Sequence, residues 1–347
     1  MTFTKRTTHA CMQPHSATAR IIGFLSLAIQ GLLACTSGLW APNAAAQGNY
    51  PAKPITIVVV APAGGTLDNL TRIISPGLAK RLGQPIIVEN KAGANAQIGT
   101  AMVARAVPDG YTLLMTYDPH ILNALSSSPK QYDAFKDFVP VSLVTRVPYV
   151  MVAATSVAAT NLKEFIQVAN RHPGSFNYST AGIASLNHLS AEAFKRAAGV
   201  QMTHVPFAGG APAVVAIVSQ QVQFGSLSYP VLKPQIDSGR VKPLAAATSS
   251  RIPGLPNLPT AKEQGFPGLE TYAWNGIFAP ARTPAPVLQR FVAELNKTLA
   301  EPEVRAKLEA AGYELVGKDL GEFGRYLDAE YQHWKKVVVD NNIKLDE

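Results

Sequence analysis

The sequence predicts an α/β protein whose sheets are mostly parallel. After the first 46 residues, short apolar segments alternate with amphipathic segments of helical period. Most of the apolar segments are continuous, which is typical of strands that are buried on both faces of a sheet. Strands and helices that alternate in this way pack as helices against a parallel sheet. The 347 residues, of which 47% are apolar and 16% are charged, suffice for one large domain or two of ordinary size.

The apolar segments place the expected strands along the chain. They are Ile55–Ala61, Pro85–Glu89, Tyr111–Thr116, Val139–Thr145, Tyr149–Ala154, Phe176–Tyr178, Met202–Pro206, Val222–Ser226 and Leu244–Ala247. Helical periodicity is clearest in Leu67–Leu82, where Pro76 and the glycine after it predict a kink or a break. A second helix is expected over Ser185–Ala198, closed by Gly199. The C-terminal part, Pro286–Val338, is expected to be helical.

The first 46 residues have the character of a bacterial secretory signal. Three basic residues and no acidic residue lie among them, followed by an apolar segment at Ile21–Ala34 and the small residues Ala44-Ala45-Ala46. The apolar segment is too short for a stable membrane span. We expect cleavage after residue 46 and export of a 301-residue chain to the periplasm.

The segment Leu32-Leu33-Ala34-Cys35 leaves a second interpretation open. It resembles a lipobox, in which Cys35 would be lipidated and become the new N-terminus of an anchored lipoprotein. Ala34 and Cys35 fit this motif, whereas Leu33 is a less usual residue there. With cleavage after residue 46, both Cys11 and Cys35 leave with the leader. The mature chain would then have no disulfide, no cysteine nucleophile and no thiolate metal site, and we expect no metal or cofactor.

The charge distribution argues against a nucleic-acid partner. The formal net charge is +8, and without the three cations of the leader 28 Lys and Arg face 23 Asp and Glu. These charges are interspersed, without basic runs or interleaved aromatic residues, as on an ordinary solvated surface. The small positive excess favours an anionic small ligand.

Two adjacent glycines join the first expected strand to the first expected helix, in the segment "APAGGTLDNLTR". Backbone N–H groups at a helix start have no partner within the helix, and glycine lets a ligand approach the backbone closely. Together with the helix dipole, these groups can form an anion site. Asp68 is then a cap or brace of the turn, because a carboxylate facing a bound carboxylate would repel it. The alternative is that Gly64 and Gly65 only make a tight connection.

Similar glycine-bearing turns follow two further expected strands. They are "NYSTAGIAS", which ends in the helix N-cap candidate Ser185, and "PFAGGAP". The carboxyl ends of parallel strands meet at one edge of a sheet, and ligands of open α/β proteins bind there. We therefore expect the three turns to converge on one ligand. None of them matches a phosphate-binding lysine motif or G-x-G-x-x-G, so a nucleotide ligand is not expected.

Motifs for catalysis are missing from the sequence. It has no G-x-S-x-G elbow and no H-E-x-x-H motif, and the histidines after the leader are scattered. His188, one turn into the second helix, is either a packing or surface histidine or a polar wall of a pocket. Trp274 and the amide of Asn275 could both line a pocket, although tryptophan is more often a core residue.

Six stretches carry a family resemblance. They are "YPAKPITIVVVAPAGGTLDNLTR", "LGQPIIVENKAGANAQIGTAMVARAVPDGYTLL", "KDFVPVSLV", "NYSTAGIASLNHLSAEAFKRAAGV", "HVPFAGGAPA" and "PEVRAKLEAAGYE". In this order, they cover nearly all of the chain from Tyr50 to about Asp346, which resembles the substrate-binding proteins of tripartite tricarboxylate transporters, the Bug receptors.

The resemblance implies a type II periplasmic binding protein of two domains that close on the ligand like a clamshell. Domain 1 would comprise residues 47–148 and 272–347, and domain 2 residues 149–271. Such a receptor is a monomer and not an enzyme, and it delivers a small carboxylate to a membrane permease of two subunits. Two alternatives stay open: a sensory receptor that presents the same closed form to a histidine kinase, and a periplasmic hydrolase of carboxylate esters.

The resemblance also implies a ligand site at the glycine turns between the two domains. Carried over to this chain, the site comprises Ala63, Gly64, Gly65, Thr66, Asp68, Tyr117, Ser179, Thr180, Ala181, Gly182, Ser185 and, behind the second turn, His188. The third turn departs from the family's usual Tyr-Lys-Gly-Gly, since it reads Phe207-Ala208-Gly209-Gly210 and lacks a hydroxyl and a cation.

A second departure concerns the distal pocket, for which Phe207, Leu227, Ser228 and Trp274 are the candidates. Leu227 stands where many members carry an aspartate that can meet the ammonium group of an amino acid. A buried ammonium group without a partner is costly. The expected ligand is therefore a carboxylate with an uncharged or aromatic distal end.

Overall fold

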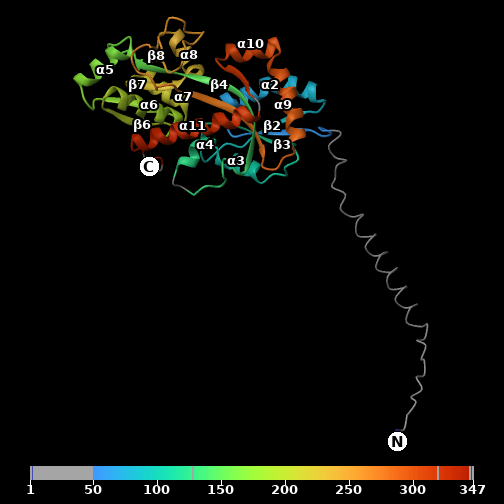
Figure 1. Ribbon diagram of the computed structural model, residues 1–347. Helices are drawn as coiled ribbons and strands as arrows, with labels where there is room; N and C mark the ends of the chain where they lie inside the picture. Colours follow the sequence, from blue (N-terminus) through green and yellow to red (C-terminus); the bar gives the residue numbers. More distant parts are fainter. Residues whose placement is uncertain (1, 3–49, 127–128, 319, 344, 346–347) are drawn as a thin grey trace. The chain divides into compact units, whose positions relative to one another are not determined.

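A computed structural model describes residues 2, 50–126, 129–318, 320–343 and 345 (Figure 1). By its internal contacts the chain divides into two units, Met1–Asn49 and Tyr50–Glu347. The elements of the fold all belong to the second unit. The expected signal sequence and the lipidation candidate Cys35 lie outside the described residues, so both stay predictions.

The described elements alternate between strands and helices. The strands are β1 Ile55–Val59, β2 Ile86–Asn90, β3 Thr112–Tyr117, β4 Phe138–Ala154, β5 Phe176–Thr180, β6 Met202–Pro206, β7 Phe224–Ser228, β8 Val241–Ala246, β9 Tyr272–Pro280 and β10 Glu314–Lys318. The helices are α2 Thr66–Leu82, α3 Gln97–Ala104, α4 Pro119–Leu122, α5 Leu162–Arg171, α6 Leu186–Ala198, α7 Gly210–Val218, α8 Tyr229–Asp237, α9 Ala285–Leu299, α10 Pro302–Ala310 and α11 Leu320–Asp340, with the 3-10 helix η2 at Asn123–Leu125. Apart from β4, β9 and β10, the strands lie within three residues of their predicted bounds.

The longest strand, β4, corrects the prediction for the middle of the chain. The two strands expected at Val139–Thr145 and Tyr149–Ala154 form one continuous strand of 17 residues. Proline cannot donate to a strand ladder, so Pro148 suggests a strand end in the sequence. In the structure Pro148 lies opposite Tyr272 of β9, and the pairing with β7 begins at the next residue. The proline thus lies where β4 leaves one partner strand and joins another.

The strands form two parallel groups joined by antiparallel strands. Their order is β2-β1-β3-β9-β4-β7-β5-β6, and β8 and β10 also pair with β4. β1 pairs in parallel with β2 and β3, and β5 pairs in parallel with β6 and β7. Each antiparallel pair of described strands includes β4 or β9. The predicted α/β class is confirmed.

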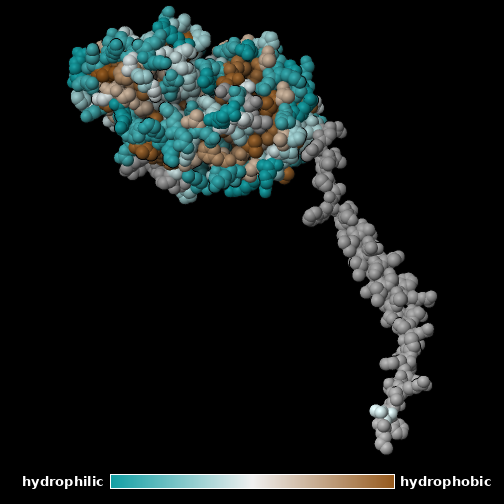
Figure 2. Space-filling model, viewed as in Figure 1, coloured by the Kyte–Doolittle hydropathy of each residue, from teal (hydrophilic) through white to brown (hydrophobic). Residues whose placement is uncertain are grey.

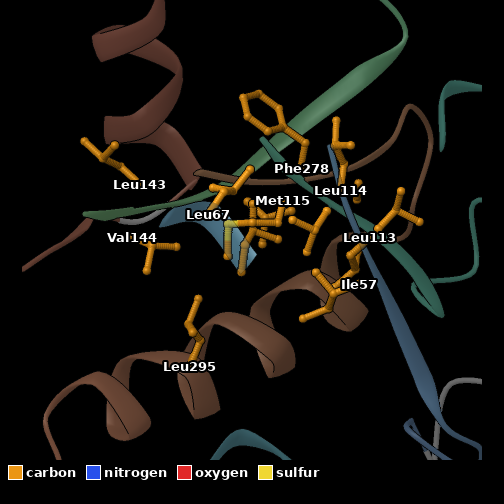
Figure 3. Close-up of a cluster of buried hydrophobic side chains, with 14 of the residues drawn as sticks. Ile57, Leu67, Leu113, Leu114, Met115, Leu143, Val144, Phe278 and Leu295 are labelled. Atoms are coloured by element: carbon orange, nitrogen blue, oxygen red, sulfur yellow. The ribbon is translucent and has the colours of Figure 1, made fainter. Parts of the chain in front are cut away.

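Buried apolar side chains gather in two clusters. The first cluster packs β1, β3 and the start of β4 against α2 and α9, and its centre includes Ile57 and Leu295 (Figure 3). The second cluster packs the end of β4 against β5, β7 and α6. The C-terminal helix α11 contributes Phe323 to the first cluster and Trp334 to the second. In Figure 1 this helix, drawn in red, extends toward α6 and β6.

Helix α2 contradicts the break predicted at Pro76. It continues from Thr66 to Leu82 with this proline inside. An interior proline costs a helix about 3 kcal/mol, but burial of the apolar face of α2 in the first cluster outweighs a local cost of this size. Gly77 permits the close packing, because a Cβ atom there would lie 2.8 Å from Cγ2 of Thr298 on α9.

The C-terminal part also departs from the prediction. Instead of being helical throughout Pro286–Val338, it contains the strand β10 between α10 and α11. Most of the visible surface of Tyr50–Glu347 is hydrophilic, with hydrophobic side chains in separate small areas (Figure 2). Among the described helices, none has the length and apolarity needed to cross a membrane.

Candidate ligand-binding site

The first glycine turn connects β1 to α2 and is braced from behind. Gly64 has a φ of +77°, in the left-handed region that glycine adopts without strain. Its N–H donates to Oδ2 of Asp68 over 2.8 Å, and the same oxygen accepts a hydrogen bond from Nε of Arg72 over 2.9 Å. Nδ2 of Asn90 donates to the other carboxylate oxygen over 3.0 Å. Both oxygens are thus occupied by the protein, which confirms Asp68 as the brace of the turn.

The electrostatics of Asp68 fit this role. Burial raises the pKa of its carboxyl group, but the hydrogen bonds from Arg72, Gly64 and Asn90 outweigh burial and hold the pKa below its usual value. The carboxylate is therefore ionised at neutral pH, and its negative charge is stabilised by these hydrogen bonds.

The second turn, between β5 and α6, is held by its own hydroxyl groups. The Thr180 hydroxyl accepts a hydrogen bond from the Gly182 N–H, over 3.2 Å. The Ser185 hydroxyl donates to the Gly182 carbonyl over 2.6 Å and, as the N-cap of α6, accepts from the His188 N–H. These contacts fix the backbone at the start of α6.

Two histidines outside the described lining of the cavity contact the second turn. Nδ1 of His188 accepts a hydrogen bond from the Ala184 N–H over 3.3 Å, and Nε2 of His204 lies 2.7 Å from the Thr180 hydroxyl. The two rings stack with their centroids 4.1 Å apart. Burial lowers the pKa of both histidines, that of His204 to about 4, so both are neutral at neutral pH.

The third turn connects β6 to α7. Gly209, the N-cap of α7, has a φ of +119°, which only glycine adopts readily. The Phe207 N–H donates to the Thr180 carbonyl over 3.0 Å, so the third turn is tied directly to the second.

The turns meet at a cavity of about 360 Å³, called here the ligand cavity. It is lined by Ala61, Pro62, Gly65, Thr66, Leu67, Asn95, Tyr117, Asp118, Pro119, Val147, Tyr149, Ala181, Ser185, Leu186, Asn187, Gly209, Gly210, Leu227, Ser228, Val231, Ala273 and Asn275. The first residues or N-caps of α2, α6, α7 and α8 are among them. Backbone N–H groups and helix dipoles therefore give the cavity a positive potential. The lining includes no lysine and no arginine.

The cavity brings together about half of the residues predicted from the sequence. Those on its lining are Gly65, Thr66, Tyr117, Ala181, Ser185, Gly209, Leu227 and Ser228. The predicted residues outside the lining are Ala63, Gly64, Asp68, Ser179, Thr180, Gly182, His188, Phe207 and Trp274. Most of these belong to the turns and support them, as described for Asp68 and Thr180.

Trp274 differs from the other outlying residues, because it belongs to the core. Its side chain is fully buried in the first cluster, with its ring centroid 5.8 Å from that of Phe323. Its neighbours on β9, Ala273 and Asn275, line the cavity instead. Side chains alternate between the two faces of a strand, so a one-residue error in register exchanges a core residue for a lining residue.

The amide of Asn275, considered as a pocket residue beside Trp274, lies on the lining. Several other lining residues were missed by sequence reasoning. The polar ones are Asn95, Asp118, Tyr149 and Asn187. Asp118 directly follows Tyr117 at the end of β3, so the rule that ligands bind at strand ends could have identified it. Asn95 lies in the β2–α3 connection, where the four consecutive residues 93–96 have positive φ values, and the sequence does not show this conformation.

Comparison with known proteins places this fold in the class of solute-binding receptors. The family model described as the tripartite tricarboxylate transporter family receptor matches residues 70–343. BugT of Bordetella pertussis is 32% identical over 321 residues, which cover 92% of this chain and 98% of BugT. A UPF0065 protein from the tcbD-tcbE intergenic region of Pseudomonas sp. strain P51 is 32% identical over 299 residues, covering 86% and 89% of the two chains.

Solved structures show the same likeness. R. palustris Rpa4515 with adipate has a TM-score of 0.78 and 32% identity, covering 85% of this chain and 99% of its own. MatC (Rpa3494) from Rhodopseudomonas palustris with bound malate has a TM-score of 0.74 and 33% identity, covering 83% and 100%. The periplasmic binding protein BugD has a TM-score of 0.75 and 30% identity, covering 85% and 99%.

The chain belongs to the tripartite tricarboxylate transporter receptor family. The resemblance found in the sequence is thereby confirmed. The members of this family are periplasmic solute-binding receptors rather than enzymes.

Proposed function

We propose that this chain is an exported receptor that binds one small organic carboxylate in the ligand cavity. The proposal rests on the composition of the lining. Four helices that pack in the two hydrophobic clusters have their N-termini on it, and it includes no lysine and no arginine. Backbone N–H groups at helix starts donate to the oxygens of a carboxylate without the desolvation cost of a buried cationic side chain. The adipate and malate bound to related proteins are of the same chemical class.

The proposed mechanism is binding coupled to closure of two domains, 47–148 with 272–347 and 149–271. Closure would remove the carboxylate from water and so strengthen its hydrogen bonds. The closed form would be recognised by a two-subunit membrane permease, or by a sensor kinase if the receptor serves signalling. The receptor would act as a monomer, because both domains must be free to move. No step of this mechanism requires a metal or a cofactor.

A thermal-shift screen tests the proposal. Purified protein freed of bound ligand is mixed with monocarboxylates, dicarboxylates, tricarboxylates, aromatic acids and amino acids. Binding to the native state alone raises the melting temperature, by an amount equivalent to about 2.7 kcal/mol at a hundredfold excess over Kd. X-ray scattering of the same samples should show a smaller radius of gyration with the ligand that gives the largest shift.

A pair of variants provides the control. Ala181 lines the cavity, and leucine in its place should reduce the thermal shift strongly. Ala208 lies exposed in the third turn outside the lining, and Ala208→Leu should leave the shift unchanged. If no carboxylate stabilises the wild-type protein, the receptor proposal is wrong, and turnover of carboxylate esters becomes the next assay. The mass of the exported protein would separate cleavage after residue 46 from lipidation at Cys35.

A further inference from the structure

The ligand cavity contains one acid that has no cationic partner among the described residues. Asp118 follows β3, lines the cavity and is only 5% exposed. Its Oδ1 accepts a hydrogen bond from the Trp274 backbone N–H over 3.3 Å. Its own backbone N–H is the other hydrogen-bond donor to the carboxyl group. A buried acid on the wall of the cavity therefore lacks a counter-charge from the described side chains, and burying an unpaired charge is costly.

The groups around Asp118 do not supply a positive charge. Burial, followed by the influence of Glu330 on α11, raises the pKa of Asp118 well above its usual value. Tyr117 on β3 and Tyr149 on β4 also lie close, and burial, followed by the charge of Asp118, raises the pKa of each. The pKa of Tyr326 on α11 is raised by burial, then by Glu330 and Asp118.

Arg146 is a cation whose charge acts on Tyr326 and Glu330, the neighbours of Asp118, and its side chain is engaged elsewhere. Its Nη2 lies 3.3 Å from Oε2 of Glu314, and its guanidinium group stacks over the ring of Tyr272 at 4.5 Å. It does not line the cavity. A positive charge beside Asp118 would therefore come from the ligand.

Two aromatic side chains on the lining favour a positively charged ligand group. Tyr117 and Tyr149 line the same cavity as Asp118. Aromatic faces attract ammonium and alkylated ammonium groups, and a nearby carboxylate completes this type of recognition. The backbone N–H groups of the helix starts attract the opposite charge, so the cavity is chemically asymmetric.

We infer that the ligand is a zwitterion, with its carboxylate at the helix N-termini and an ammonium or alkylated ammonium group at Asp118. This inference rests on the proposed function, and it names the class of ligand more closely. It replaces the expectation of an uncharged distal end, which followed from the leucine at position 227. The structure offers an acid from a different strand, β3 instead of β7. A dicarboxylate, in contrast, would place a second anion next to Asp118 and Glu330.

Matched ligands test the inference. Wild-type protein freed of bound ligand is titrated calorimetrically with 5-aminopentanoate, L-leucine and glycine betaine. The comparison compounds are pentanoate, 4-methylpentanoate and glutarate, which have a carboxylate but no nitrogen. At least one zwitterion should bind about 30-fold or more tightly than its nitrogen-free analogue, since loss of one partner of a buried charge pair costs about 2–5 kcal/mol.

Variants assign the effect to the acid. Asp118→Asn should remove this preference while binding of the nitrogen-free acids stays equal or improves. The control is Asp109→Asn, because Asp109 is a surface residue paired with Lys53 over 3.4 Å; it should keep the wild-type preference. Titrations of the wild type in buffers of different ionisation enthalpy give a readout that needs no variant. A zwitterion that ionises Asp118 should release a proton on binding.

The possible results distinguish failure of the zwitterion inference from failure of the proposed function. If glutarate or pentanoate binds more tightly than every zwitterion, or if Asp118→Asn keeps the preference, the zwitterion inference is wrong and the carboxylate receptor stands. If the Asp118→Asn variant does not fold, the proton measurement on the wild type decides. Binding of zwitterions without proton release would then also overturn the inference. If none of these compounds binds, the zwitterion inference is wrong, and the broad thermal-shift screen decides whether the proposed function fails with it.

Discussion

At the residue scale, the site depends on side chains that never touch the cavity. Asp68 joins the first turn, the first helix and β2 through hydrogen bonds to Gly64, Arg72 and Asn90. The sequence predicted its role, because an acid at a helix start facing a bound anion is electrostatically unfavourable. The partnership with Asn90 could not be predicted, since it joins residues 22 positions apart.

Replacing Asp68 should destabilise the protein. Asp68→Ala leaves the Gly64 N–H and the Asn90 amide without their buried acceptor, and we expect a loss of about 1–3 kcal/mol. Glu309→Ala, which removes an exposed ion pair with Arg305, should cost no more than about 1 kcal/mol. Urea unfolding of both variants measures the difference, and equal losses would show that Asp68 is not a brace.

The stacked histidines predict an acid-sensitive stability. The folded-state pKa values of His188 and His204 lie below the usual value of about 6.5. The unfolded chain therefore binds protons first as the pH falls. The stabilisation is complete above about pH 6.5 and is lost progressively toward about pH 4.

Unfolding by urea between about pH 7 and about pH 5 measures this loss. His120 is buried, and burial lowers its pKa to about 3, so it contributes to the same trend. The variant His188→Asn/His204→Asn isolates the pair and should show a shallower decline than the wild type. An unchanged slope would mean that the pair does not titrate on unfolding.

At the scale of elements, sequence patterns found most of the described strands but missed β9 and β10. β1 and β3, which were found, consist mainly of apolar residues. β9 contains Asn275, Gly276 and a final proline, which are uncommon in strands. It forms because β3 and β4 flank it on both sides. In β9, pairing with strands distant in the sequence outweighs local propensity. A sequence pattern reports only on local residues, so it did not predict this strand.

The close packing of β9 against α11 gives a prediction at this scale. A Cβ atom on Gly276 would lie 2.3 Å from Cζ of Phe323. Gly276→Ala should therefore destabilise the protein by about 1–3 kcal/mol. A second substitution, Phe323→Leu, should recover part of the loss by making room.

The control for this prediction is another glycine. A Cβ atom on Gly210 would meet only ordinary contacts at 3.9 Å, from Val231. Gly210→Ala should change stability by less than about 1 kcal/mol, in either direction. Thermal unfolding of the three variants decides the matter, and equal melting temperatures for the two single variants would contradict the packing argument.

At the scale of the whole molecule, the family and the α/β class were predictable from the sequence, and the lining of the cavity only in part. The three glycine turns stand out because each needs unusual backbone angles. Tyr149 and Asn187 carry no such local signal, and only the folded sheet brings them to the cavity. The two hydrophobic clusters share β4 and α11, a connection that no local pattern indicates.

This shared architecture predicts cooperative unfolding. Because β4 and α11 contribute to both clusters, loss of one cluster removes part of the other. Scanning calorimetry should show one transition with equal calorimetric and van't Hoff enthalpies. Trp334→Ala, which removes a side chain buried in the second cluster, should cost about 3–5 kcal/mol and separate the transition into two. Two transitions in the wild type would show that the clusters unfold independently.

The absence of lysine and arginine from the described lining of the ligand cavity has a consequence for how ligand binding depends on pH. Peptide N–H groups do not gain or lose protons at any pH at which the protein folds. The N–H donors proposed to bind the carboxylate thus keep the same charge, and the acidity of the ligand decides how much of it is in the charged form that these donors would bind. A bacterium that uses this receptor in an acidic medium would recover strong organic acids efficiently and leave weaker ones behind.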